Sequence, residues 1–344
     1  MKLLVVTQKV DKNDENLGAF YLWWEMLSRH VEHLTLIASC VGDVNLPSNV
    51  TVVSLGKESG RGKLARIWKF LELFSYHYAR TDAVFFHQIP EFVLAASPFL
   101  LALKRKSFLW YAHGSVSQKL KWAERLVDFV LTSSAGGFRL PSKKVLYLGQ
   151  AIDETRFLSV ERSFDPGKPL CLVTVGRIAP IKDYETLLRA CKVLKDTFDR
   201  AFVLSIVGGP ILARDHEYLA LLKKLAAELK LEDVVHFRGA QPFSAIPALL
   251  QESDIFLNLS RTGSLDKAVL EAMSCGLTTI TANEAYKSFL PPHYFLDRVS
   301  PEFVAARVKL LAAEARPNKA LREIVLAQHS LSKTIGKIVS LLHE

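Results

Sequence analysis

The stretch LCLVTVGRIAPIKDYETLLRA, residues 170–190, joins a short apolar run to an amphipathic segment through a glycine and a basic turn. The apolar run is rich in β-branched side chains and predicts a buried strand over 170–175. Apolar positions after Tyr184 repeat at helical spacing and predict a helix over 184–198. A strand, a glycine turn and a helix in this order form the repeating unit of a parallel α/β sheet.

The same alternation runs along most of the chain. In the first half we expect strands over 3–7, 34–38, 51–55, 83–87, 108–112 and 144–148, with helices over 17–29 and 64–79. In the second half we expect strands over 170–175, 201–207, 233–237, 254–259 and 277–281, with helices over 184–198, 214–229, 243–252 and 265–275. Continuous apolar strands between helices indicate parallel sheets covered on both faces. The pattern therefore predicts two tandem, doubly wound α/β domains, Rossmann-like and facing across a cleft.

A polar segment without periodicity, RFLSVERSFDPGKP at 156–169, interrupts the alternation. It predicts a domain over 1–158, a linker over 159–168 and a second domain over 169–326. The remaining residues, 327–344, form an amphipathic pattern and predict a C-terminal helix.

Composition limits the class of protein. The 344 residues are 49% hydrophobic and 23% charged, which is typical of a globular protein of two domains. The net charge of +9 suits anionic partners, but the cations are spread over both halves without a recognisable module, which argues against nucleic acid. Four well-separated cysteines and the absence of Cys-x-x-Cys argue against a metal site or disulfides and favour the cytoplasm. No secretory signal is expected at the N-terminus, and the apolar run 92–103 is too short to span a membrane.

A second informative stretch is RTGSLDKAVLEAMSCG, residues 261–276, which predicts a helix that holds a carboxylate among apolar neighbours. Ser264 is the expected N-cap and Asp266 the expected first-turn acid, so the free amides near 263–266 could bind an anion. Glu271 follows seven residues after Ser264, which is about 10.5 Å along the helix axis. A nucleoside diphosphate beside this helix would place its phosphates at the start and its ribose diol near Glu271.

Residues at three further strand ends give weaker indications of ligand binding. Arg177 and Lys182 flank the turn after 170–175, where they either converge on one anion or are solvated surface cations. SIVGGPI at 205–211 contains Gly209 in what is either a tight turn or a ligand loop. VVHFRGAQP at 234–242 ends in Gly239, where backbone amides could contact a flat ring.

Taken in order, these motifs resemble those of a known protein family. V-G-R-x₄-K, V-G-G-P, H-F-x-G and L-E-A-M-S-C-G resemble the nucleotide-sugar domain of family-4 glycosyltransferases of the GT-B fold. Gly18-Ala19, WYAHGS at 110–115 and LGQAIDETRF at 148–157 extend the resemblance, more loosely, over nearly the whole chain. The resemblance also implies that the helix at 327–344 crosses back onto the first domain.

The resemblance implies residue roles. Arg177 and Lys182 would hold the donor diphosphate, Glu271 would bind the ribose, and His113 would face the donor sugar. The implied catalytic residues are His113, Arg177 and Lys182. The implied nucleotide-sugar-binding residues are Gly18, Gly176, Gly209, Gly239, Ser264, Leu265, Asp266 and Glu271.

It also implies an activity. The expected reaction is retaining transfer of a hexosyl or N-acetylhexosaminyl unit from a nucleoside-diphosphate sugar, such as a UDP sugar, to a cell-envelope glycan or lipid-linked acceptor. No cofactor and no metal are expected, and no Asp-x-Asp motif occurs. The expected location is the cytoplasm, with possible peripheral contact at the inner face of an anionic membrane.

One position departs from the family pattern. Glu271 matches the second acid of the family's E-x₇-E signature, and this chain has Gly263 where the family has the first acid, eight residues earlier. Either Asp266 or the backbone amides of 263–265 then serve the sugar, or the protein is a catalytically silent nucleotide-sugar-binding subunit of a partner transferase. An epimerase on a similar fold is a third alternative.

Two features of the first half leave alternatives open. His87 in FFHQIPE also follows a strand and competes with His113 for the sugar-facing or acceptor position. In KESGRGKLARIWKFLELFSYHYAR, residues 57–80, five basic residues from Lys57 to Lys69 precede an aromatic-rich helix. That helix either docks on anionic lipid headgroups or is a buried sheet-covering helix with a wet, charged rim.

Overall fold

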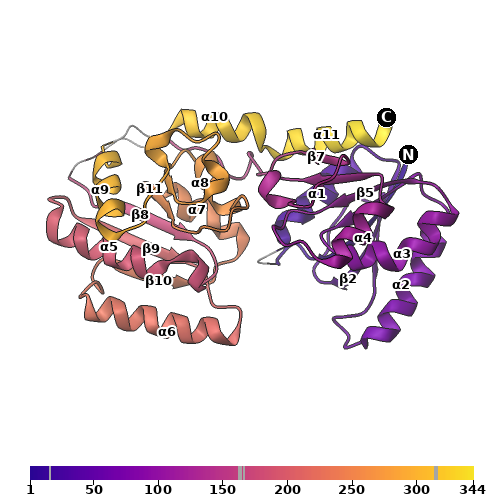
Figure 1. The fold of residues 1–344 in the computed structure, drawn as a ribbon, viewed down its shortest axis with the longest axis horizontal. Coiled ribbons are helices and arrows are strands. Elements are labelled where there is room, and N and C mark those ends of the chain that lie inside the picture. Colours follow the sequence, from indigo (N-terminus) through magenta and orange to yellow (C-terminus); the bar gives the residue numbers. More distant parts are fainter. Residues whose placement is uncertain (15–16, 162–164, 166, 314–316) are drawn as a thin grey trace. The chain divides into compact units, whose positions relative to one another are not determined.

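The computed structural model describes residues 1–14, 17–161, 165, 167–313 and 317–344 (Figure 1). The chain forms two compact units: Met1–Ala151 with Leu331–Glu344, and Ile152–Ser330. The boundary at Ala151–Ile152 lies ahead of the predicted linker at 159–168, of which residues 162–164 and 166 lie outside the described residues. Phe157 shows why, because its side chain is fully buried in the core of the second unit and its carbonyl accepts a hydrogen bond from Ser274 Oγ at 2.8 Å.

The first unit is built on a seven-stranded parallel sheet of order β3-β2-β1-β4-β5-β6-β7. The strands are β1 (Lys2–Val10), β2 (His33–Val41), β3 (Val50–Ser54), β4 (Ala83–His87), β5 (Lys106–Trp110), β6 (Phe129–Thr132) and β7 (Val145–Tyr147). Its helices are α1 (Gly18–Ser28), α2 (Lys63–Tyr78), α3 (Pro90–Ala102), α4 (Gln118–Leu126), α11 (Leu331–His343) and the 3₁₀ turn η1 (Ala135–Gly137). Every strand pair is parallel, as the continuous apolar runs predict.

The sheet of this unit buries both faces. Alternate residues of β1 point to opposite sides, so Leu3 and Val5 join a core with α1 and α11, while Leu4 and Val6 join a core with α2, α3 and α4. Helix α11 packs against α1, so the last residues of the chain complete the first unit.

Three elements of the first unit escaped the sequence analysis: β6, α3 and α4. Helix α3 holds most of the apolar run 92–103, and Val93 and Ala96 on it are fully buried against the sheet. Pro98 lies inside α3, and a proline in a helix removes one backbone hydrogen bond and obscures the helical signal. Within the described residues, no helix has the length and apolar character needed to cross a membrane.

The second unit is built on a five-stranded parallel sheet of order β10-β9-β8-β11-β12. The strands are β8 (Leu170–Val175), β9 (Phe202–Val207), β10 (Val235–Gly239), β11 (Ile255–Asn258) and β12 (Thr278–Thr281). The helices are α5 (Tyr184–Thr197), α6 (Ala213–Glu228), α7 (Ile246–Gln251), α8 (Lys267–Ser274), α9 (Pro301–Leu311) and α10 (Lys319–Gln328), with 3₁₀ turns η2 (Pro180–Lys182), η3 (Phe243–Ala245), η4 (Glu284–Tyr286) and η5 (Pro292–Tyr294). The strand order reverses at β8, which pairs with β9 on one side and β11 on the other. In such sheets a crevice opens at the carboxyl ends of the strands, at the reversal.

Candidate functional site

At the strand reversal of the second unit, the loop after β8 meets the loop after β11. The first loop carries Arg177 and Lys182, and the second carries Gly263 to Asp266. The structure joins the two loops through an ion pair between Lys182 Nζ and Asp266 Oδ2, with side chains only 13% and 17% exposed. Two residues that are 84 positions apart in the sequence therefore meet at the strand reversal.

Asp266 is held by a network that the sequence analysis missed. Asn258 Nδ2 donates to Asp266 Oδ2 at 2.9 Å, and Thr281 Oγ1 donates to Asn258 Oδ1 at 3.1 Å. Tyr286 OH donates to the carbonyl oxygen of Asp266 at 2.6 Å. Asn258 and Thr281 are the last residues of neighbouring strands and pair in register. The available signal was a polar residue at the end of each of two buried strands, IFLN and TTIT.

The start of α8 corrects the sequence prediction. The helix begins at Lys267 with Asp266 as its N-cap residue, whereas Ser264 was predicted as the N-cap and Asp266 in the first turn. Gly263 has a left-handed φ of 67°, and the carbonyl of Ser264 accepts a hydrogen bond from Asn283 Nδ2 at 2.8 Å. These features keep the chain non-helical up to Leu265. Glu271 thus lies about 7.5 Å along the axis from the N-cap rather than about 10.5 Å.

Glu271 is a buried carboxyl group, with 5% of its surface exposed. Burial raises its pKa to about 7, while Lys267 and Arg156 act to lower it and Asp266 acts to raise it. Burial also lowers the pKa of Lys267, one helical turn earlier. A buried carboxyl group with a raised pKa marks this position as a functional candidate.

Glycines allow close contact between the loop after β8 and the loop after β9. A Cβ atom on Gly208 would lie 1.9 Å from the carbonyl oxygen of Gly176, so only glycine fits there. That carbonyl also accepts a hydrogen bond from Tyr184 OH at 3.1 Å. The Gly209 carbonyl accepts from the amide of Ile178 at 2.9 Å, and Gly239, with φ of 70°, accepts from the amide of Gly208 at 2.8 Å. These contacts fix the loop that carries Arg177 and Lys182.

The remaining predicted residues of the second unit differ in accessibility. Arg177 is exposed, and Ser264 is half-buried. Leu265 is buried in the apolar core, so it can offer a ligand only its backbone. Among the described residues, no group of three or more His, Cys, Asp and Glu side chains is arranged to hold a metal ion.

In the first unit, the two competing histidines have different surroundings. His87, at the end of β4, is 1% exposed, lies with its ring centroid 4.1 Å from that of Phe20, and its Nδ1 is 3.0 Å from Thr7 Oγ1. His113, after β5, is exposed, and its Nδ1 lies 2.9 Å from Ser115 Oγ. Accessibility therefore favours His113 for contact with a ligand.

Gly18 is the first residue of α1 and is buried. Its amide donates to the carbonyl oxygen of Asp14 at 3.0 Å, so this amide already has an acceptor. A contact between the amide of Gly18 and a ligand would require that hydrogen bond to open.

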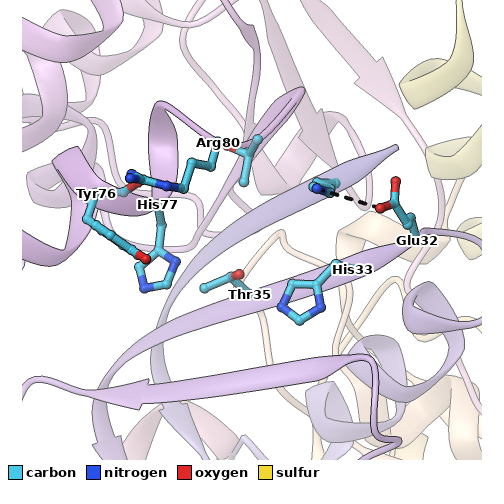
Figure 2. A pocket seen from close by; sticks show the side chains of 8 residues that line it. Glu32, His33, Thr35, Tyr76, His77 and Arg80 are labelled. Atoms are coloured by element: carbon cyan, nitrogen blue, oxygen red, sulfur yellow. Dashed lines mark hydrogen bonds and ion pairs between the residues drawn. The ribbon is translucent and has the colours of Figure 1, made fainter.

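The first unit also has a cavity of about 390 Å³ lined by Lys2, Glu32, His33, Thr35, Tyr76, His77, Arg80 and Thr81 (Figure 2). Lys2 and His33 are the first residues of β1 and β2. The cavity therefore lies at the amino edge of the sheet, opposite the edge where doubly wound units bind ligands. It is not part of the candidate site.

Comparison with known proteins finds a family match within the second unit. Residues 157–289 match the family model described as glycosyl transferases group 1. The chain is 29% identical over 245 residues to the putative colanic acid biosynthesis glycosyltransferase WcaL of Salmonella typhimurium, covering 68% of this chain and 51% of that protein. It is 27% identical over 186 residues to the GDP-mannose-dependent alpha-(1-6)-phosphatidylinositol monomannoside mannosyltransferase of Mycobacterium tuberculosis, covering 49% and 46%. The chain thus spans about half the length of these relatives.

Among solved structures, Anabaena HepE in complex with UDP and glucose is similar over 100% of both chains, with a TM-score of 0.76 and 14% sequence identity. At that identity the likeness shows the fold alone. It agrees with the two parallel sheets and their covering helices, which together form the GT-B fold.

Proposed function

We propose that the chain is a metal-independent, retaining glycosyltransferase, because residues 157–289 match the group 1 glycosyl transferase model and the two units have the GT-B fold. The proposed reaction moves a hexosyl or N-acetylhexosaminyl unit from a nucleoside-diphosphate sugar to a glycan or lipid-linked acceptor. UDP is the proposed nucleotide, since the similarly folded HepE is described in complex with UDP and glucose.

One observation carries the proposal. At the strand reversal of the second unit, Lys182 meets the start of α8, and the same helix holds the buried carboxyl group of Glu271. A cation and a helix start favour a diphosphate, and a carboxylate farther along the helix can accept two hydrogen bonds from a ribose diol. The two features together match the two ends of a nucleoside diphosphate.

The proposed catalysis depends on stabilising the negative charge of the leaving group. When the bond between the anomeric carbon and the diphosphate oxygen breaks, negative charge accumulates on the departing nucleoside diphosphate. Arg177 and Lys182 would stabilise that charge, as a metal ion does in other transferases. Lys182 is already paired with Asp266, so the diphosphate would have to share or replace that carboxylate as the partner of Lys182.

Groups of the first unit are proposed to serve the sugar and the acceptor. His113 is the exposed histidine of the competing pair and is assigned to the donor sugar, together with the loop at Gly18. The relatives are named for colanic acid biosynthesis and for mannosyl transfer to a phosphatidylinositol monomannoside, which supports a cell-envelope glycan or a lipid-linked acceptor here. The proposed location is the cytoplasm.

The test measures nucleoside diphosphate release from a panel of donor sugars, with and without acceptor. Arg177→Ala and Lys182→Ala are each expected to reduce turnover at least tenfold, since one charge-stabilising donor contributes about 3 kcal/mol to the transition state. Arg189→Ala removes an exposed cation from α5 and serves as the matched control with unchanged turnover. Normal turnover in either site variant would exclude the proposed charge stabilisation.

A second candidate is a nucleotide-sugar-binding subunit without turnover. It is favoured by Gly263, where the family has an acid and where the left-handed φ of 67° disfavours any side chain. The release assay, combined with a thermal-shift measurement of donor binding, separates the transferase from the silent subunit. Donor binding without release of nucleoside diphosphate, from any donor and with any acceptor, would support the silent subunit.

A further inference from the structure

The first two turns of helix α2 expose three large apolar side chains. Leu64, Ile67 and Trp68 are 76%, 41% and 73% exposed, and they follow at the i, i+3, i+4 spacing of one helix face. Exposed apolar side chains are ordinary when scattered singly, but three neighbours of this size, including a tryptophan, mark an interaction surface.

The second half of the same helix is firmly anchored. Phe70, Phe74 and Tyr78 are at most 3% exposed, and the ring centroids of successive members lie 5.3 and 5.0 Å apart. The alternative of a sheet-covering helix is confirmed for the face of α2 that carries Phe70, Phe74 and Tyr78, whereas the lipid-docking alternative is not tested by these contacts. A rigid base thus presents the first two turns to solvent.

The exposed turns are strongly basic. Between positions 57 and 69 five cations accompany one acid, Glu58; three of the cations lie on α2 and two lie in the segment before it. We name Leu64, Ile67 and Trp68, with Lys57, Arg61, Lys63, Arg66 and Lys69, the α2 surface.

A cavity of about 300 Å³ opens beside this surface. Leu55, Ile67, Phe70, Phe92 and Ala95 give it apolar walls, and its lining also includes Ser39, Lys63, Arg66 and Glu91. Arg66 Nε is buried and has no hydrogen-bond partner among the described residues. A cation beside an apolar cavity suits a group with a phosphate and a hydrocarbon chain.

We propose that the α2 surface docks the first unit on an anionic lipid bilayer. Leu64, Ile67 and Trp68 enter the interface between headgroups and acyl chains, and the surrounding cations contact lipid phosphates. An amphipathic helix with lysine and arginine beside tryptophan and leucine binds membranes in this way, with apolar burial and charge attraction acting together.

Charge complementarity favours the bilayer over a second copy of the chain. A second copy of the chain would bring the same five cations against each other, which opposes self-association through this surface. An anionic leaflet supplies many phosphates at once and needs no matching shape. Because α2 follows β3, its first turn lies at the carboxyl edge of the sheet, so docking would bring the ligand-binding edge of the unit close to the membrane.

The test is flotation of the full-length protein with vesicles of phosphatidylcholine, alone or with about a third phosphatidylglycerol. Binding is expected only to the anionic vesicles and is expected to weaken at least tenfold between low salt and about 0.5 M salt, because salt screens exposed charges. Trp68 fluorescence, followed in a Trp122→Phe background that removes the other exposed tryptophan, should shift to shorter wavelength on binding.

Two double variants separate the contributions of apolar burial and of positive charge to vesicle binding. Leu64→Ser with Trp68→Ser removes apolar burial, and Arg61→Gln with Lys69→Gln removes two cations; each is expected to reduce partitioning at least tenfold. The matched control, Leu221→Ser with Lys223→Gln, changes one exposed leucine and one exposed lysine on α6 of the second unit and should partition as the unchanged protein does. Donor binding by thermal shift reports on the second unit and should be unaltered in all three.

Equal binding to neutral and anionic vesicles, no binding to either, or normal binding by both α2 variants would overturn the proposal. So would an unchanged protein that elutes as a dimer and becomes monomeric with Leu64→Ser and Trp68→Ser, since the surface would then join two copies. Because vesicle binding is measured without donor or acceptor, its failure leaves the proposed transferase activity untouched, and loss of that activity leaves the docking result intact.

Discussion

Glu271 shows how one side chain links folding to ligand binding. Burial raises its pKa to about 7, so the folded state binds this proton more tightly than the unfolded chain does. Ionisation therefore costs folding free energy as the pH rises from the unfolded value near 4.5 towards 7, and the cost is complete above that range. A ribose diol that donates to the carboxylate would offset this cost, which gives the residue a ligand-dependent role.

The corresponding prediction is a pH dependence of donor affinity. Only the ionised carboxylate accepts two hydroxyl hydrogen bonds, so affinity for a nucleoside-diphosphate sugar should rise about tenfold from pH 6 to pH 8, with a midpoint near 7. The sugar-linked diphosphate carries no group that titrates in this range. Calorimetric titration of the unchanged protein and of Glu271→Gln at several pH values measures the effect.

Glu271→Gln should bind more weakly at pH 8 and show little pH dependence. Glu252→Gln removes an exposed carboxylate at the end of α7 and should keep the full dependence. A pH profile that Glu271→Gln leaves intact would assign the titration to another group.

Individual residues also show which parts of the candidate site could be predicted from the sequence and which could not. Glu271 and Lys182 could be selected from the sequence because their motifs are local. Asn258, Thr281 and Tyr286, which hold Asp266, could not, because their importance depends on which strands are neighbours. The pairing of Asp266 with Lys182 likewise appears only after the strand order is known.

At the level of elements, most strand bounds and most helix starts were predicted closely, and α1, α2, α5 and α6 each begin within one residue of the prediction. The bounds of β4 and β8 agree with the sequence prediction, because each is a continuous apolar run with polar neighbours. The start of α8 was placed too early, because Ser264 has the composition of an N-cap but its carbonyl is held by Asn283. β6 and α4 were missed because each is short and its apolar residues do not form a long periodic run.

The close contact between the loops after β8 and β9 gives a prediction about elements. Gly208→Ala would place a Cβ atom against the carbonyl oxygen of Gly176, and backbone on both sides leaves no flexible side chain to yield. The loop that carries Arg177 and Lys182 must then shift, so donor affinity should fall at least tenfold, since a misplaced charged donor loses most of its contribution. Titration calorimetry with the donor measures this.

Gly336→Ala is the control for that substitution. Gly336 lies on α11 in the first unit with no atom within 4 Å of the added Cβ, so donor affinity should not change and helix propensity should improve by about 1 kcal/mol. Equal affinity of Gly208→Ala and the unchanged protein would mean that the loop position is not important for donor binding.

At the scale of the whole molecule, the chain leaves the first unit at Ala151, builds the second, and returns at Leu331. The hydrogen-bond partner of Thr334 Oγ1 is the carbonyl of Leu148 at 3.0 Å, and Ile335 and Ile338 lie in the core beside α1. The first unit therefore cannot complete its core until the second has been synthesised. The two sheets keep separate apolar cores, which makes their stabilities separable.

This separation predicts an asymmetric response to a change in α11. Ile338 is fully buried, so Ile338→Ala should destabilise the first unit by about 2–5 kcal/mol, from lost burial and the cavity left behind. The second unit makes no use of that side chain in its core, so donor binding there should persist at temperatures where the first unit has begun to unfold. Hydrogen exchange resolved by segment, with and without donor, measures the stability of both units in one protein.

Lys337→Ala, an exposed neighbour on the same helix, controls for helix propensity and should leave both units unchanged. Faster exchange in β8 and β11 of Ile338→Ala, equal to that in β1 and β5, would show instead that the two units unfold as one.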